Sequence, residues 1–143
     1  MPVIEKIRSH SSSETFETGR NLGLKARPGD LFALYGDLGT GKTVLAKGIA
    51  RGLGISEEIT SPTFTLLEIY ENILPFYHFD LYRIDNPREL DALYFEEYWE
   101  GDGVSVVEWA DRAAGRLPET ALRITLEYLE ESIRSITIER PDN

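Results

Sequence analysis

Residues 36–43 of the chain read Gly-Asp-Leu-Gly-Thr-Gly-Lys-Thr, which fits the pattern G-x-x-x-x-G-K-[ST]. The glycines allow the backbone to curl so that successive N–H groups point inward at phosphate oxygens. A helix that starts after such a turn adds the positive end of its dipole. Lys42 can place a positive charge between the β- and γ-phosphates of a nucleotide, and the Thr43 hydroxyl can bind Mg²⁺. The stretch therefore predicts a phosphate-binding turn.

The segments on either side of this turn have the structures that the motif requires. Leu31–Tyr35 is a continuous apolar run, which is typical of a strand covered on both faces. After the turn, apolar residues recur at helical spacing over residues 44–53, and Gly54 stands where a helix would end. A strand, a glycine-rich turn and a helix in this order predict a P-loop. The residues expected to contact the nucleotide here are Asp37, Leu38, Gly39, Thr40, Gly41, Lys42 and Thr43.

The rest of the chain alternates helical and extended patterns. Ser11 and Glu14 have the spacing of a capping box, which predicts a helix to about residue 26. A second helical stretch is expected to begin at Asn86-Pro87 and to run through about Trp99. Alternating or β-branched sequence predicts a short half-buried strand at residues 3–7 and further strands at 64–70, 73–79, 104–107, 122–128 and 133–139.

This order of elements predicts the fold class. Helices that alternate with apolar strands are typical of α/β proteins, and 143 residues suffice for one core but not for two ordinary domains. We therefore expect a single domain over residues 1–143. Its architecture would be a P-loop NTPase-like three-layer sandwich, with a mostly parallel central sheet and antiparallel marginal strands.

Two carboxylates follow apolar strands and are candidates for the magnesium site. Residues 104–107 end in Glu108, and the aromatic-rich residues 76–79 end in Asp80. A P-loop enzyme needs such an acid at the end of a neighbouring strand to hold the metal, directly or through water. We expect a role in hydrolysis for Lys42, Asp80 and Glu108, and leave the division of roles between the two acids open.

The loop at residues 60–65 follows the helix of the P-loop and contains several hydroxyl groups. In an ordered switch, such hydroxyls can sense a γ-phosphate through the metal, and Thr63 is the candidate for this role. The alternative is a proline-containing turn that leads into a strand.

Composition limits the partners of the chain. The net charge of −10 disfavours direct binding to a polyphosphate backbone, so any RNA is expected to be held by another protein. The absence of cysteine excludes disulfides and thiolate metal sites. Neither a signal peptide nor a stretch of about 20 apolar residues is evident, so we expect a cytoplasmic location and no membrane partner.

Taken together, these motifs resemble the TsaE family, also called YjeE, of bacterial P-loop ATPases. The resemblance rests on five collinear motifs, at residues 36–43, 61–66, 77–83, 108–109 and 117–118. Phe64 stands where the family frequently has tyrosine, which removes a phenolic hydroxyl. The segment that precedes the P-loop matches by pattern more than by residue identity.

The resemblance implies a role in forming threonylcarbamoyladenosine in tRNAs that read codons beginning with adenine. Family members bind the TsaD–TsaB pair and hydrolyse ATP to support its turnover, without transferring the threonylcarbamoyl group themselves. It also implies that Thr43 and Glu108 bind Mg²⁺, that Asp80 is needed for hydrolysis and that Thr63 belongs to the switch loop. Trp109 would lie beside the nucleotide. The implied ligands are ATP and Mg²⁺, and hydrolysis is expected to be slow without the partners.

Several alternatives remain open at this point. The same phosphate-binding turn serves small-molecule kinases, although their Arg-bearing lid is not evident, and it also serves non-catalytic adaptors that respond to ATP or ADP. Trp109 is equally plausible as a core residue. We expect His78 to pack or hydrogen-bond beside Asp80, and Arg83 either to stabilise the γ-phosphate or to be an ordinary surface residue.

Overall fold

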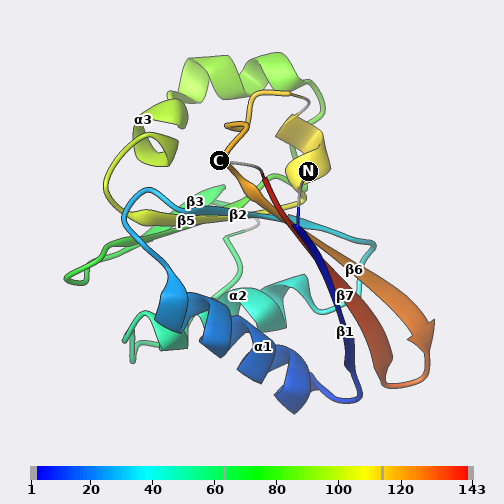
Figure 1. The fold of residues 1–143 in the computed structure, drawn as a ribbon. Coiled ribbons are helices and arrows are strands. Elements are labelled where there is room, and N and C mark those ends of the chain that lie inside the picture. The colour runs from blue at the N-terminus through cyan, green and yellow to red at the C-terminus, as the bar shows by residue number, and fades with distance from the viewer. Residues whose placement is uncertain (1–2, 63, 114, 142–143) are drawn as a thin grey trace.

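The computed structural model describes residues 3–62, 64–113 and 115–141, and within them seven strands form one sheet. The order across the sheet is β1-β7-β6-β2-β5-β4-β3. Figure 1 shows this sheet between helices on its two faces. The strands are β1 (Val3–Ser9), β2 (Leu31–Tyr35), β3 (Leu67–Tyr70), β4 (Phe76–Asp80), β5 (Val104–Glu108), β6 (Leu122–Glu130) and β7 (Ile133–Arg140).

The centre of the sheet is parallel and its margins are antiparallel, as predicted. Strands β6, β2, β5 and β4 run in one direction. The antiparallel pairs are β1 with β7, β7 with β6, and β3 with β4. Strand β2 is buried from Leu31 through Leu34, which confirms the prediction of a strand covered on both faces.

Helices cover both faces of the sheet and make three layers (Figure 1). Alternate residues of β2 divide between two cores: Phe32 and Leu34 pack in the core on one face, whereas Leu31 and Ala33 pack in the other. The first core includes α1 (Ser12–Lys25) and α2 (Lys42–Gly52), and the second includes η1 (Pro87–Leu93), α3 (Glu96–Trp99) and η2 (Ala110–Ala113). The three-layer sandwich predicted from the sequence is confirmed.

Helices α1 and α2 approach each other closely through glycine. A Cβ on Gly48 would lie 2.1 Å from the Phe16 carbonyl oxygen, and one on Gly19 would lie 2.3 Å from that of Leu45. Real Cβ atoms do not approach backbone oxygens so closely, so only glycine allows this packing. The contact fixes the position of α2, whose first residues are Lys42 and Thr43.

Three predicted elements differ in the structure. The helix expected from Asn86 to about Trp99 is interrupted at Tyr94, which has a φ of 56°, so η1 and α3 are separate. The strand expected at residues 64–70 begins only at Leu67, because the preceding residues form a turn in which Leu66 N–H donates to Pro62 O at 2.7 Å. The strand expected at 73–79 begins at Phe76.

Strand β1 is the fourth difference. Its first residues are exposed rather than half-buried, with Val3 at 61% and Ile4 at 56%, because β1 is an edge strand that pairs with β7 alone among the described strands.

The predicted Ser11 cap of α1 is confirmed, since the Ser11 side chain accepts a hydrogen bond from Glu14 N–H at 3.1 Å. Across the described ranges, no helix combines the length and the apolar character that crossing a membrane requires.

Candidate functional site

The P-loop lies at the edge of the sheet where β2 ends and α2 begins. Gly36, Gly39 and Gly41 have φ values of 145°, 80° and 104°, in the region that glycine tolerates best. A Cβ on Gly36 would lie 2.5 Å from the Leu126 carbonyl oxygen, so this position requires glycine for space as well. Gly41 is the N-cap of α2 and offers no side-chain cap. The first amides of α2 therefore remain available to an anion.

The side chain of Lys42 is folded back onto the turn. Its Nζ donates to Gly36 O at 2.5 Å and to Asp37 O at 2.8 Å, and it lies 4.1 Å from the centroid of the Trp109 ring. Burial lowers the pKa of Lys42, although the negative charge of Glu108 opposes the shift. A buried cation held by neutral carbonyls is suited to bind a negatively charged ligand.

Glu108 connects the P-loop to the neighbouring strand. Thr43 Oγ1 donates to Glu108 Oε1 at 2.8 Å, and His78 Nε2 lies 2.5 Å from Glu108 Oε2. Glu108 is the last residue of β5, and its partner in the parallel register is Asp80, the last residue of β4. The two acids predicted from the sequence thus lie side by side at the carboxyl edge of the sheet, where ligands bind in open α/β sheets.

Asp80 joins the same edge to the loop that follows α2. Ser61 Oγ donates to Asp80 Oδ2 at 3.2 Å, and the Tyr82 amide donates to Asp80 Oδ1 at 2.9 Å. The contact with Ser61 thus joins an acid of the candidate site to the loop in which a switch is predicted. Thr63, the residue predicted for the sensing role, lies outside the described residues.

Trp109 lies directly after Glu108 and has a φ of 57°, which is unusual for a large residue. Its ring packs against Tyr82, with centroids 4.8 Å apart, and the Arg112 guanidinium lies 5.9 Å from it. Trp109 is partly buried and lines the cleft beside Lys42. Its strained backbone is of a kind that is typical of functional sites.

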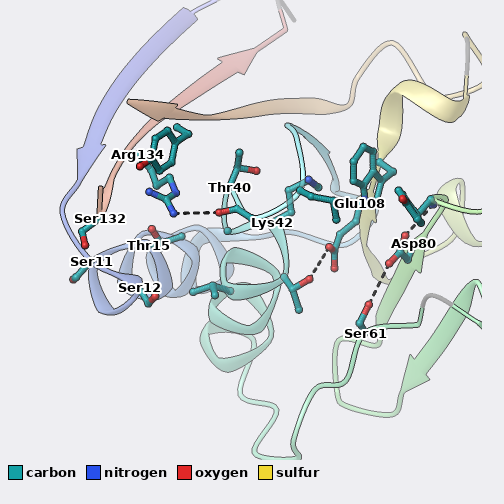
Figure 2. Close-up of a pocket in the computed structure, with 18 of the residues that line it drawn as sticks. Ser11, Ser12, Thr15, Thr40, Lys42, Ser61, Asp80, Glu108, Ser132 and Arg134 are labelled. Carbon is teal, nitrogen blue, oxygen red and sulfur yellow. Dashed lines mark hydrogen bonds between the residues drawn. The ribbon is translucent and has the colours of Figure 1, made fainter. Parts of the chain in front are cut away.

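One cleft of about 840 Å³ is lined by residues of the P-loop together with Ser61, Asp80, Glu108 and Trp109. Figure 2 shows Asp80, Ser61 and Glu108 at one end, Lys42 and Thr40 in the middle, and Arg134 with the start of α1 at the other end. Arg134 donates to Gly39 O at 3.2 Å and its guanidinium lies 4.7 Å from the centroid of the Tyr128 ring. The lining at this second end consists of His10, Ser11, Ser12, Thr15, Tyr128, Glu131, Ser132 and Arg134.

The donor set at the first end fits Mg²⁺. This ion prefers oxygen ligands and is usually held by one or two carboxylates together with substrate phosphates and water. Thr43 and Glu108, the predicted metal ligands, provide a hydroxyl and a carboxylate in direct contact. In the described part of the chain, no group of three acidic or histidine side chains could hold a metal by itself. Phosphate oxygens and water are the ligands that usually complete the coordination of such a magnesium ion.

The structure brings most of the predicted site residues together. Leu38, Gly39, Thr40, Gly41, Lys42, Thr43, Asp80, Glu108 and Trp109 all line the cleft. Asp37 is exposed and does not line it; its carbonyl oxygen accepts from Thr40 Oγ1 and Lys42 Nζ and so shapes the turn.

The structure also shows the surroundings of His78 and Arg83. His78 Nε2 contacts Glu108, because in the parallel register of β4 and β5 it lies diagonally across from Glu108, the register partner of Asp80. Arg83 is exposed and lies 5.0 Å from the ring centroid of Phe64, outside the cleft. Its placement gives no support for a role on the γ-phosphate.

Sequence reasoning missed the second end of the cleft. Tyr128 and Arg134 belong to the β6–β7 hairpin, about 90 residues after the P-loop along the chain, and no local motif marks them. The signal that could have found them is sheet order, because β6 pairs with β2 and so brings the hairpin beside the P-loop.

Comparisons with known proteins identify the family of the chain. The family model for the threonylcarbamoyl adenosine biosynthesis protein TsaE matches residues 9–136. The tRNA threonylcarbamoyladenosine biosynthesis protein TsaE of Treponema pallidum (strain Nichols) is 42% identical over 130 residues, covering 91% of this chain and 96% of that protein. The protein of the same name from Bacillus subtilis (strain 168) is 41% identical over 133 residues, covering 92% and 83%.

A solved structure supports the same relationship. The crystal structure of Bacillus subtilis YdiB superposes with a TM-score of 0.87 and 36% sequence identity, covering 100% of this chain and 89% of that one. The α/β fold is therefore shared with a solved structure, and most of the chain is similar in sequence to known proteins. The chain belongs to the TsaE family of proteins, which act in the biosynthesis of threonylcarbamoyladenosine in tRNA.

Proposed function

We propose that this chain is a magnesium-dependent ATPase of the cytoplasm that binds the TsaD–TsaB complex. Its hydrolysis of ATP would support the modification of tRNAs that read codons beginning with adenine. The observation that carries the proposal is the contact between Thr43 of the P-loop and Glu108 of the neighbouring strand, beside the buried Lys42. A phosphate-binding turn alone would suit any nucleotide-binding protein, whereas this acid adds a place for the metal.

Each residue of the site has a role in this reaction. Amides of the P-loop and of the start of α2 would bind the phosphates, and Lys42 would leave the Gly36 and Asp37 carbonyls to contact the γ-phosphate. Thr43 and Glu108 would hold Mg²⁺, which neutralises charge on the transferred group when bound. Asp80, paired in register with Glu108, would orient the attacking water. Trp109 would lie beside the nucleotide.

The same contacts suggest why the chain alone would be slow. Lys42 is held by the carbonyls of its own turn, and the Thr43 hydroxyl is held by Glu108. Nucleotide and metal must replace these contacts. Asp80 and the loop at residues 60–65 must also be positioned around the bound nucleotide at the same time. A partner that stabilises the active arrangement would raise the rate by a population shift.

The first test compares ATP hydrolysis by the chain alone and by the chain with TsaD–TsaB. We expect slow turnover alone and an increase of at least about tenfold with the partners, equivalent to a barrier change of about 1.4 kcal/mol. TsaD–TsaB without the chain is the control for background hydrolysis. Equal and fast rates in the presence and absence of the partners would rule out stimulation by the complex.

The second test is the substitution Glu108→Gln, which keeps the shape of the side chain and removes its charge. We expect magnesium-dependent kcat to fall by about 100-fold, since a fixed charge at the transferred group is lost. ATP affinity should change much less, because Lys42 and the backbone amides remain. Glu127→Gln, at an exposed position of β6, is the matched control. Retained magnesium-dependent turnover in Glu108→Gln would instead assign the metal to Asp80.

A further inference from the structure

A buried histidine faces the site from the neighbouring strand. His78 lies on β4 within the aromatic run Phe76–Asp80, and its side chain has no exposed surface. The ring stacks on that of Phe76, with centroids 5.8 Å apart and an angle of 28° between the planes. An apolar residue would fill this place in the core equally well, so the imidazole needs a reason beyond packing.

The polar contact of this histidine is with Glu108. His78 Nε2 lies 2.5 Å from Glu108 Oε2, and both side chains are almost fully buried, with exposures of 0% and 3%. Since a carboxylate oxygen accepts, Nε2 carries the proton and donates. Within the described part of the chain, Nδ1 has no hydrogen-bond partner. The ring is therefore oriented by its contact with Glu108 and by stacking.

Glu108 is thus held at both oxygens. Oε1 accepts from Thr43 and Oε2 is bonded to His78. If Thr43 and Glu108 held Mg²⁺, the contact of Glu108 Oε1 with Thr43 would give way to the metal, and the contact of Oε2 with His78 would still orient the carboxylate. Groups that bind the second oxygen of a metal ligand fix its orientation, and their loss typically costs 10–100-fold in metal affinity or activity.

From this geometry we propose that His78 is a positioning residue, which holds the Glu108 carboxylate toward Thr43 for magnesium binding. The inference rests on the proposed function, because it concerns the metal of the same site. His78 itself does not touch the nucleotide, since it does not line the cleft. It acts through Glu108, so its replacement should weaken the response to magnesium rather than the binding of the nucleotide as such.

The test measures ADP affinity by calorimetry with Mg²⁺ and with a chelator, in His78→Leu and His78→Gln. The ratio of the two affinities reports how strongly magnesium and nucleotide bind together. We expect His78→Leu to lower this ratio by about 10-fold or more. The ADP affinity measured in the presence of the chelator should change little. His78→Gln should recover part of the loss, because its amide can donate to Glu108. The kcat of ATP hydrolysis should fall with the ratio, while KM for ATP changes little.

Stability is controlled with Phe79→Leu, a buried substitution on the same strand that faces the opposite core. It should lower Tm without changing the magnesium response. A second control adds His78→Leu to Glu108→Gln, where no further loss is expected because the group being positioned is already changed.

The outcomes separate the two proposals. If the unaltered chain binds neither ADP nor ATP with Mg²⁺, the proposed function fails and this inference fails with it. If the unaltered chain responds to magnesium and folded His78→Leu keeps the same response, only the inference about His78 fails. An equally large loss of the magnesium response in Phe79→Leu would also contradict the inference, because lower stability alone would then explain the effect of His78→Leu.

Discussion

Burial of the charged Lys42 side chain is unfavourable for stability, whereas the same charge is proposed to bind phosphate. The Lys42 side chain is almost fully buried, with 5% of the residue exposed, and burial lowers its pKa. We expect Lys42→Met to raise Tm at pH 7.5, because the charged form is disfavoured in the folded state. The same substitution should lower ATP affinity by about 100-fold or more, because a charged contact to phosphate is lost.

The pH dependence of this stability difference has a definite sign. Between the lowered pKa and 10.5, the unfolded chain holds the Lys42 proton more tightly than the folded chain, so the stability of the unaltered protein rises with pH. The Tm advantage of Lys42→Met should therefore shrink as the pH rises through that window. Lys47→Met, at an exposed position of α2, is the control. A lower Tm for Lys42→Met at pH 7.5 would mean that the carbonyl bonds and Trp109 outweigh desolvation.

The site residues that the sequence predicted are those whose chemistry follows from their place in a motif. Lys42 and Thr43 end the P-loop pattern, and Glu108 ends an apolar strand, so each could be assigned before the strands were paired. The contact between His78 and Glu108 could not be predicted, because it depends on the register of β4 against β5. The side chain of Arg134 likewise reaches Gly39 only through the pairing of β6 with β2.

At the scale of elements, the packing of α1 on α2 positions the P-loop. Gly48 lies in α2 beneath the Phe16 carbonyl oxygen, and an added Cβ would lie 2.1 Å from that atom. We expect Gly48→Ala to lower the free energy of unfolding in urea by about 1–3 kcal/mol, because the backbones must move apart. ADP affinity should also fall, since the start of α2 moves with the helix.

The control for this prediction uses an exposed position of the same helix. Lys47→Ala removes an exposed side chain and should change the free energy of unfolding by no more than about 0.5 kcal/mol. Alanine is otherwise favoured over glycine in helices by about 1 kcal/mol, so helix propensity alone predicts that Gly48→Ala stabilises. A stabilised Gly48→Ala variant would show that the close approach of the two helices is not required.

The elements that the sequence misplaced are interrupted or shortened by residues with a left-handed backbone, Tyr94 and Leu66. The helical pattern over residues 86–99 is correct locally, but Tyr94 adopts a left-handed conformation as η1 ends, before Phe95 and Trp99 enter the core beside Phe79. Strand β3 begins late because the chain before it is still turning: Leu66 has a φ of 69° and its amide donates to Pro62 O at 2.7 Å. Tertiary packing outweighed local propensity at Tyr94, and a local turn did so before β3.

At the scale of the whole molecule, β2 lies between β5 and β6, and the P-loop leaves the sheet at this point. The strands on both sides of β2 in the sheet therefore lead to the same cleft. This explains why residues from near both ends of the sequence line it. The parallel centre of the sheet could be predicted from its buried apolar strands. The strand order could not, because the hydrophobic pattern of a strand does not specify its neighbours.

The net charge of the molecule leads to a prediction about tRNA. With 25 acidic residues against 15 lysines and arginines, the chain has a net charge of −10 and would be repelled by a polyanion, so we expect no binding to tRNA by the chain alone. Fluorescence anisotropy of labelled tRNA checks this at about 50 and 200 mM salt, since non-specific binding weakens steeply over that range. TsaD–TsaB should bind the same tRNA, with the chain joining through protein contacts. Salt-sensitive binding by the chain alone would contradict this and would require a local basic surface that outweighs the overall charge.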